Sequence, residues 1–142
     1  MSCIEKVLAR RSVRKFTDTP VSEEVLNNIL EAGRLAPSAT NNQPWHFVVV
    51  GFYRQSEVII EKLSLMDVTI SLQNMVIAGW IQGVSSCWMG AFDERKLQDS
   101  LELPSDARIV GAIAFGISNE KPRQPPKKPT KEIFHFEKWQ SR

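Results

Sequence analysis

The sequence has few of the residues that most metal and disulfide sites need. Its two cysteines, Cys3 and Cys87, lie far apart, and its two histidines, His46 and His135, are equally isolated. These numbers exclude a disulfide framework and leave too few ligands for a zinc site. Long apolar runs are also absent, and the charged N-terminus does not resemble a signal peptide. We therefore expect a cytoplasmic protein with no membrane span and no metal ion.

The sequence also lacks the glycine-rich motifs that bind nucleotides. Neither GxGxxG nor GxxxxGK[ST] occurs, so a Rossmann site and a P-loop are both unsupported. The net charge of +2 is too small to indicate nucleic acid as a partner. What remains is an ordinary globular composition, 42% hydrophobic and 24% charged over 142 residues, which predicts a single domain over residues 1–142.

Hydrophobic spacing and capping residues predict the order of the elements. Ser22 and Asp93 are expected N-caps, and the apolar residues of 67–83 cover so much of a helix that we expect it to be buried and central. Expected helices cover residues 2–10, 23–33, 67–83 and 94–101, and expected strands cover 45–50, 85–89 and 109–116. No regular βαβ rhythm links them, which favours an α+β fold.

The segment RRSVRKF, residues 10–16, is the first candidate for ligand binding. In an extended backbone, Arg10, Ser12 and Arg14 project to one side, and two guanidinium groups with a hydroxyl suit a phosphate. The alternative is a solvated basic turn. Lysines of the proline-rich segment KPRQPPKKPTKE, residues 121–132, can complete a phosphate site or form a solvated tail.

Two further segments have compositions that suit a flat ligand. PSATNNQPW, residues 37–45, is rich in small polar side chains, and its alternative is a capping loop. In SCWMGAF, residues 86–92, Gly90 permits close approach of a ligand to the backbone, whereas the alternative is a packed strand end. No nucleophile and base are paired in the sequence, so we expect a bound cofactor to supply the chemistry.

Together the motifs RRSVRKF, APSATNNQPWHFVVV, DVTISLQNMVIAGW, SCWMGAFDERKL, IVGAIAFG and KKPTKEIFHFEKW resemble the FMN-dependent nitroreductase family over nearly the whole chain. The resemblance implies a mostly antiparallel central sheet flanked by helices. It also implies an intertwined homodimer with two FMN molecules at the subunit interface, and a C-terminal arm, residues 121–142, that packs on the partner subunit.

The resemblance assigns cofactor-binding positions in this sequence. One set grasps the phosphate, the ribityl chain and the pyrimidine edge of the flavin: Arg10, Arg11, Ser12 and Arg14, with Lys127 at the position of a phosphate-binding arginine. A second set approaches the flavin of the other subunit: Pro37, Ser38, Ala39, Asn41 and Gln43. A third set presents its backbone near flavin N5: Cys87, Trp88, Met89 and Gly90. No protein side chain is expected to act as a catalytic residue.

This chain departs from the family in one interval. Only about 17 residues separate Val50 from the central helix, where family members normally carry a helix and a further strand. We favour a helix for this interval because it contains Glu, Lys and Leu. The alternative is a strand that pairs back on FVVV as a hairpin. In either case the elements that cover the substrate are reduced, and we expect an open pocket.

The resemblance implies an NAD(P)H oxidoreductase that reduces nitroaromatic compounds, quinones or similar acceptors by a ping-pong cycle. NADH and NADPH cannot be distinguished because the family has no readable nicotinamide motif. Two alternatives remain open. One is a reductive dehalogenase or flavin-fragmenting relative, and the other is a flavin-binding dimer without catalytic activity, which the shortened interval favours.

Overall fold

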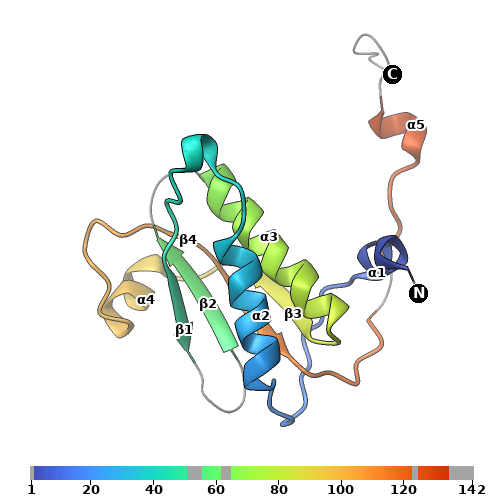
Figure 1. Cartoon of the computed structure of the whole chain (residues 1–142), viewed down its shortest axis with the longest axis horizontal. Helices are drawn as coiled ribbons and strands as arrows, with labels where there is room; N and C mark the ends of the chain where they lie inside the picture. Colours follow the sequence, from blue (N-terminus) through green and yellow to red (C-terminus); the bar gives the residue numbers. More distant parts are fainter. Residues whose placement is uncertain (1, 51–55, 62–64, 123–124, 135–142) are drawn as a thin grey trace.

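The computed structural model describes residues 2–50, 56–61, 65–122 and 125–134, which form a sheet with helices on both faces (Figure 1). The strands are β1 (Phe47–Val50), β2 (Ser56–Glu61), β3 (Ser85–Met89) and β4 (Ile109–Gly116). Their order is β1-β2-β4-β3, and every neighbouring pair is antiparallel. The predicted α+β architecture with an antiparallel sheet is confirmed.

The helix that we favoured after β1 is wrong, because residues 56–61 form strand β2. This strand pairs with β1 in the hairpin that was the alternative, with Val48 opposite Ile59. On its other side β2 pairs with β4. Hydrogen-bonded neighbours on both edges and the β-branched run of residues 58–60 outweigh the modest helix propensity of Glu, Lys and Leu. Residues 51–55 and 62–64 of the same interval lie outside the described residues.

Two helices begin at Ser22 and Asp93, the caps that the sequence predicts, and the first helix begins at a further cap, Ser2. The side chains of Ser2, Ser22 and Asp93 each accept a hydrogen bond from a backbone N–H three residues later. The helices are α1 (Cys3–Ala9), α2 (Glu23–Arg34), α3 (Leu65–Ile81), α4 (Glu94–Ser100) and α5 (Thr130–Ile133), with a 3₁₀ turn η1 (Ala39–Asn41).

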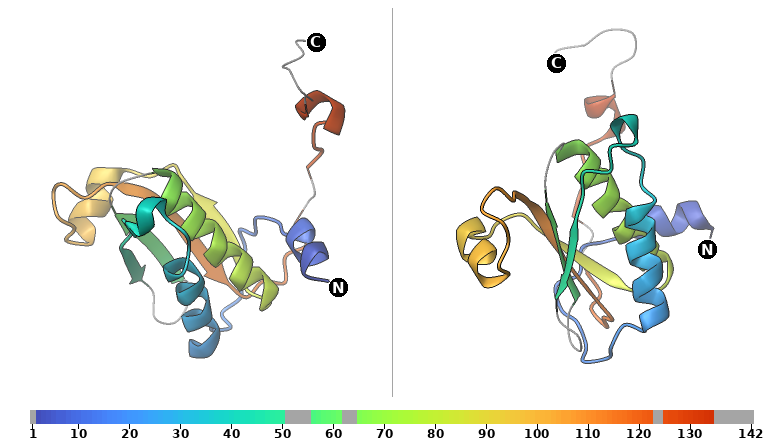
Figure 2. Two further views of the ribbon diagram at one scale, coloured as in Figure 1. Left: turned by 45° about the horizontal axis from the view of Figure 1, so that its top comes forward. Right: turned by 60° about the vertical axis from the view of Figure 1, so that its left-hand side comes forward.

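The main core lies between the sheet and the layer formed by α2 and α3, while α4 covers the opposite face (Figure 2). Leu72, Met75, Ile113 and Phe115 are almost fully buried there. Gly33 permits α2 to approach α3 closely, because a Cβ atom at this position would lie 2.2 Å from Met75 Cε. The close packing of these two helices fixes the direction of α3 across the sheet.

Helix α3 is central, but its own chain covers only one of its faces. Val68, Leu72 and Val76 are inaccessible to solvent, whereas Leu65 and Met66 are 62% and 72% exposed. The all-round burial that we expected is therefore not provided by a single chain. The large apolar side chains of α1 and α3 that remain exposed, which we call the apolar face, are Ile4, Val7, Leu8, Leu65, Met66, Ile70 and Ile81.

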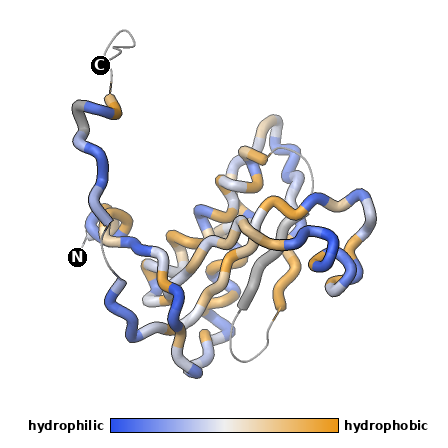
Figure 3. The backbone as a smooth tube through the Cα atoms, turned by 180° about the vertical axis from the view of Figure 1, so that it is seen from behind, coloured by the Kyte–Doolittle hydropathy of each residue, from blue (hydrophilic) through white to orange (hydrophobic). Residues whose placement is uncertain are grey.

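The described part of the C-terminal arm extends away from the sheet (Figure 1). Figure 3 shows it as hydrophilic along most of its length, with a hydrophobic end. That end consists of Ile133 and Phe134, which are 53% and 60% exposed. The remaining aromatic residues of the arm lie outside the described residues. The body of its own chain therefore does not cover the apolar end at residues 133–134.

Candidate functional site

The basic segment at residues 10–16 lies along the sheet in an extended conformation. Ser12 forms an isolated parallel bridge with Ser86 of β3, and the Val13 N–H donates to the Ser86 carbonyl at 2.9 Å. Val13 is 1% exposed, so it anchors the segment in the core. Alternation along an extended backbone then places Arg10, Ser12 and Arg14 on one side and Val13 on the other.

The residues that follow β4 hold the other end of this segment. The Thr17 N–H donates to the Ile117 carbonyl at 2.7 Å, and Ser118 Oγ donates to the Lys15 carbonyl. Phe16 packs directly on Gly116, where a Cβ atom would lie 2.7 Å from Phe16 Cδ1. Contacts from β3 and from residues 116–118 therefore fix the backbone that carries the arginines.

A pocket of about 680 Å³ opens beside the basic segment, and we call it the anion pocket. Its wall brings together five of the predicted site residues with α1 and the C-terminal arm: Val7, Leu8, Arg10, Arg11, Ser12, Arg14, Glu120, Pro122, Pro125 and Lys127. Four cationic side chains and one carboxylate line the same pocket, so its lining is positively charged. Such a lining suits a ligand with a phosphate or another dianionic group.

The arginines of the anion pocket differ in how much hydrogen-bonding capacity they keep. Arg11 Nη1 donates to the carbonyls of Leu8 and Arg10 at 2.9 and 2.7 Å, so this atom caps the end of α1. Arg10 Nη1 is buried and has no hydrogen-bond partner among the described residues. A buried guanidinium N–H without an acceptor is costly, and a bound anion would satisfy it. Arg10 therefore fits a ligand phosphate better than Arg11 does.

A carboxylate in the wall of the pocket contacts the backbone of the basic segment. Glu120 Oε2 accepts hydrogen bonds from the N–H groups of Arg14 and Lys15, at 2.8 and 3.0 Å. These two bonds, first that from Arg14, hold the pKa of Glu120 below its ordinary value, and the nearby cationic side chains lower it further. The carboxylate is therefore ionised at neutral pH.

The second predicted set lies outside the anion pocket. Pro37, Ser38 and Ala39 lead into η1, at the Leu65 end of α3 (Figure 2). The anion pocket is at the opposite end, where Lys6 Nζ donates to the Ile81 carbonyl at 3.2 Å. Because 17 residues of helix span about 25 Å, one chain does not bring these two sets together.

The loop at residues 37–43 is held by its own hydrogen bonds and has an unusual backbone. The Gln43 N–H donates to Ser38 Oγ at 2.9 Å, and Gln43 Nε2 donates to the Asn41 carbonyl at 3.3 Å. Thr40, Asn41 and Gln43 have φ angles of 51°, 56° and 46°. A positive φ is costly for a β-branched threonine, and such strain is concentrated at functional sites.

The third predicted set occupies the end of β3. Trp88 packs against the main core, and Met89 packs on the opposite face of the sheet against Ile109 and Ala112. Gly90 is exposed, and no atom lies within 4 Å of a Cβ atom placed there. Packing within this chain therefore does not require glycine at position 90, which leaves room for a ligand beside the strand end.

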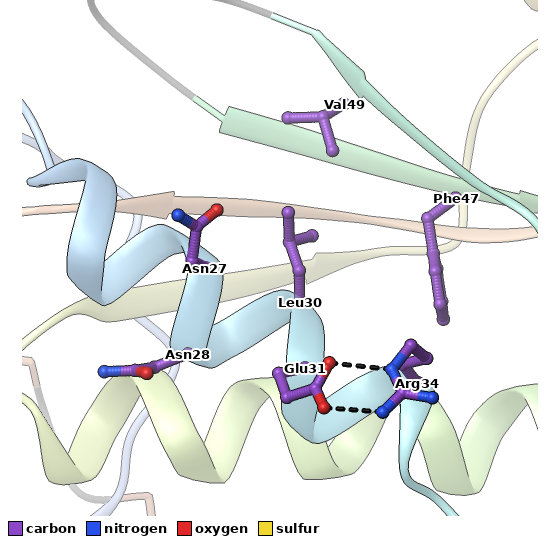
Figure 4. Close-up of a pocket in the computed structure, with 7 residues that line it drawn as sticks. All are labelled: Asn27, Asn28, Leu30, Glu31, Arg34, Phe47 and Val49. Carbon is purple, nitrogen blue, oxygen red and sulfur yellow. Dashed lines mark hydrogen bonds and ion pairs between the residues drawn. The ribbon is translucent and has the colours of Figure 1, made fainter.

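Sequence reasoning missed a second pocket, of about 580 Å³, between α2 and β1 (Figure 4). Leu30, Phe47 and Val49 form its apolar part, and Arg34 donates to both oxygens of Glu31 at 2.7 and 2.6 Å. The hydrogen bond from Arg34 lowers the pKa of Glu31. None of the predicted site residues lines this pocket. The only signal in the sequence is the spacing of three between Glu31 and Arg34, which predicts an ion pair and no ligand.

The described part of the chain lacks the features of two other classes of site. No group of three histidine, cysteine or acidic residues there could hold a metal ion. Among the same residues, no helix is long and apolar enough to cross a membrane.

Comparison with known proteins identifies related sequences. The model of the nitroreductase family matches residues 7–64 and 51–117. A protein of Methanothermobacter thermautotrophicus, provisionally named an NADH dehydrogenase/NAD(P)H nitroreductase, is 28% identical over 178 aligned positions, covering 98% of this chain and 88% of the relative. The alignment is longer than the 142 residues of this chain, so the relative carries residues that this chain lacks. FMN reductase (NADPH) of Bacillus subtilis is 24% identical, covering 86% of this chain and 70% of the relative.

Solved structures share the fold. Nitroreductase A of Vibrio parahaemolyticus superposes with a TM-score of 0.90 at 20% identity, covering 98% of this chain and 77% of the other. A protein of Desulfovibrio desulfuricans, provisionally named a nitroreductase and solved in complex with FMN, gives a TM-score of 0.84 at 24% identity, covering 96% of this chain and 97% of the other. This chain therefore has the fold of these nitroreductase structures.

Proposed function

Because this chain belongs to the nitroreductase family, we propose that it is an FMN-dependent NAD(P)H oxidoreductase. The observation that carries the proposal is the anion pocket, in which the buried Nη1 atom of Arg10 has no partner among the described residues. The names of several relatives, among them an FMN reductase (NADPH), support the same chemistry. We further propose nitroaromatic compounds, quinones or similar electron acceptors as the second substrate, in a ping-pong cycle.

The residues of the anion pocket have distinct proposed roles. Arg10, Ser12 and Lys127 hold the FMN phosphate, because an arginine fork, a hydroxyl and an ammonium group all suit phosphate oxygens. Arg14 approaches the pyrimidine edge, where its charge stabilises the negative charge of the reduced ring. Bound FMN supplies the redox chemistry by accepting a hydride from NAD(P)H and passing two electrons to the acceptor.

The end of β3 and the loop at residues 37–43 complete the site from two directions. The backbone N–H groups near Met89 and Gly90 approach flavin N5, with no side chain at position 90 to block them. The loop lies at the far end of α3 from the anion pocket of its own chain. We propose that Pro37, Ser38 and Ala39, with Asn41 and Gln43, serve the flavin of the partner subunit instead.

A homodimer accounts for the exposed apolar surface. The side chains of the apolar face on α1 and α3 are 36–72% exposed, and the described part of the arm ends in Ile133 and Phe134, which are 53% and 60% exposed. Burying surfaces of this kind is the main driving force of subunit association. We propose that the apolar face forms the centre of the dimer interface and that the C-terminal arm packs on the partner subunit.

The proposal is tested with purified protein under anaerobic conditions. We expect flavin absorbance, or binding of added FMN, then bleaching by NADH or NADPH, and reoxidation by a nitroaromatic compound or a quinone. Protein that binds FMN and is bleached by neither nicotinamide would support the flavin carrier instead. Protein that ignores added FMN would contradict both. Light scattering after size-exclusion chromatography reports the dimer separately.

Reductive dehalogenation is a second candidate with one specific observation behind it. An iodotyrosine deiodinase of Daphnia pulex is 49% identical over 83 residues, which cover 56% of this chain and 27% of the relative. Incubation of reduced protein with an iodinated tyrosine distinguishes this candidate. Release of iodide at a rate above that of nitroaromatic reduction would favour it.

A further inference from the structure

We infer that Glu120 is a positioning residue for the anion pocket, which holds the backbone of Arg14 and Lys15 so that the basic segment faces the ligand. The inference rests on the proposed FMN site. Glu120 lies in the connection between β4 and the C-terminal arm, more than 100 positions from the segment that it contacts. No sequence motif pointed to it.

Ser118 and Glu120, which follow β4, form hydrogen bonds with two N–H groups and one carbonyl group of the basic segment. Ser118 Oγ donates to the Lys15 carbonyl and accepts a hydrogen bond from the Glu120 N–H at 3.0 Å. The Glu120 carboxylate then accepts from the N–H groups of Arg14 and Lys15 through a single oxygen, Oε2. The backbone at residues 14–15 is therefore held on both its N–H and its carbonyl side.

The contact is needed because the segment repels itself. Arg10, Arg11, Arg14 and Lys15 place four cations within six residues, and like charges at this spacing favour spreading apart. Val13 and Ser12 fix the middle of the segment against β3, but Arg14 and Lys15 are exposed beyond that anchor. Glu120 is the carboxylate among the pocket's lining residues. It therefore holds the exposed residues 14–15, which lie between the anchors at Val13 and Thr17, in register before a ligand arrives.

Two substitutions separate the length of the Glu120 side chain from its charge. Glutamine keeps the length of the side chain, and its amide oxygen can accept both N–H groups without a charge. Aspartate keeps the charge but is one methylene shorter, so its oxygens fall short of hydrogen-bond distance. A positioning role predicts that Glu120→Gln resembles the wild type and that Glu120→Asp resembles Glu120→Ala. A role limited to charge compensation predicts the reverse order.

The experiment measures FMN binding by flavin fluorescence and amide hydrogen exchange of Arg14 and Lys15 in the protein without flavin. We expect Glu120→Gln to bind FMN within about twofold of wild type and Glu120→Asp to bind about tenfold more weakly, the size expected for hydrogen bonds to a charged group. The two amides should stay protected in Glu120→Gln and exchange faster in Glu120→Asp. Glu24→Ala, which removes an exposed carboxylate of α2, controls for net charge.

The outcomes separate this inference from the proposed function. If Glu120→Asp matches wild type in both measurements while Glu120→Gln does not, the positioning role is overturned. Equal binding and equal exchange in all variants would also overturn it. Wild-type protein that binds no FMN contradicts the proposed function, while the exchange data still decide whether Glu120 holds the segment. Because Glu120→Gln and Glu120→Asp change few atoms, the comparison does not depend on whether Glu120→Ala folds.

Discussion

Two pockets lined by described residues are similar in volume and differ in charge. The anion pocket encloses about 680 Å³ and the pocket between α2 and β1 about 580 Å³, and each contains arginine. Arg34 is bound at two of its nitrogens by Glu31, whereas Arg10 Nη1 is buried and lacks a partner among the described residues. Space alone therefore does not mark a ligand site. A buried guanidinium nitrogen without an acceptor supports a ligand site, because a bound anion would remove its cost.

The sharpest test asks whether the two halves of the proposed site come from different subunits. Arg10→Ala should disable the anion pocket of its own chain, and Ala39→Trp should block the flavin held by the partner. Each variant alone should bind FMN about 100-fold more weakly than wild type, and should stay almost empty at FMN concentrations that saturate the wild type. When the two are mixed and allowed to exchange subunits, each mixed dimer contains one intact site and one doubly altered site. We expect titration of the mixed dimer to reach one FMN per dimer.

Mixed dimers that still bind no FMN would contradict the assignment of the loop to the neighbouring flavin. Dimers reassembled from each variant alone serve as the control for damage during subunit exchange.

The next test compares the two arginines directly. Arg10→Ala should weaken FMN binding by about 100-fold, because charge-assisted hydrogen bonds to phosphate contribute about 2–3 kcal/mol. Arg34→Ala removes the same charge from the other pocket and should change FMN affinity by less than about twofold, since Glu31 already neutralises it. Equilibrium titration with FMN measures both, and comparable losses would remove the distinction between the pockets.

A smaller effect is expected at the C-terminal arm. Lys127 lines the anion pocket and its neighbour Lys128 does not, although both are exposed. Lys127→Ala should weaken FMN binding about fivefold, whereas Lys128→Ala should leave it unchanged, because an exposed ammonium contributes about 1 kcal/mol. Lys127→Arg should tighten binding through a bidentate contact with phosphate. Riboflavin, which lacks the phosphate, should bind all three variants equally.

The smallest expected effect concerns the ion pair of Glu31 and Arg34 in the pocket between α2 and β1. Arg34 lowers the pKa of Glu31, so this pair stabilises the fold above the ordinary pKa of a glutamate, near 4.5, and the stabilisation is lost as pH falls through the lowered pKa. Glu31→Gln should therefore lower Tm slightly at pH 7, and the difference from wild type should disappear in acid. A difference that grows below pH 4 would show that the pair does not act in this way. Thermal unfolding followed by circular dichroism measures it.

Local signals in the sequence predict most of this fold. Ser22 and Asp93 cap the helices that their side chains predict, and the apolar run of residues 109–116 is the buried strand β4. These features depend on a few neighbouring residues. The strand at 56–61 depends instead on pairing with β1 and β4, so helix propensity gave the wrong element there.

The candidate site also contains some residues that local sequence signals predict and others that depend on contacts between distant parts of the chain. The basic segment is visible in the sequence because four cations in six residues are unusual, and the structure places Arg10, Ser12 and Arg14 in one pocket. Glu120 was not visible, because its contact with Arg14 joins residues 106 positions apart. The same holds for the pocket between α2 and β1, which exists only when a helix and a strand pack together. Whether the loop at residues 37–43 reaches a second flavin stays a prediction.

Helix α1 takes part in two surfaces at once. Val7 and Leu8 form part of the wall of the anion pocket and are also part of the exposed apolar face. A helix of seven residues is not stable alone, and α1 depends on the bond from Trp80 Nε1 to the Lys6 carbonyl and on the cap provided by Arg11. Under the proposed function, a ligand that orders α1 also orders the surface for the partner. By thermodynamic linkage, FMN should lower the dissociation constant of the dimer by the same factor by which dimerisation tightens FMN.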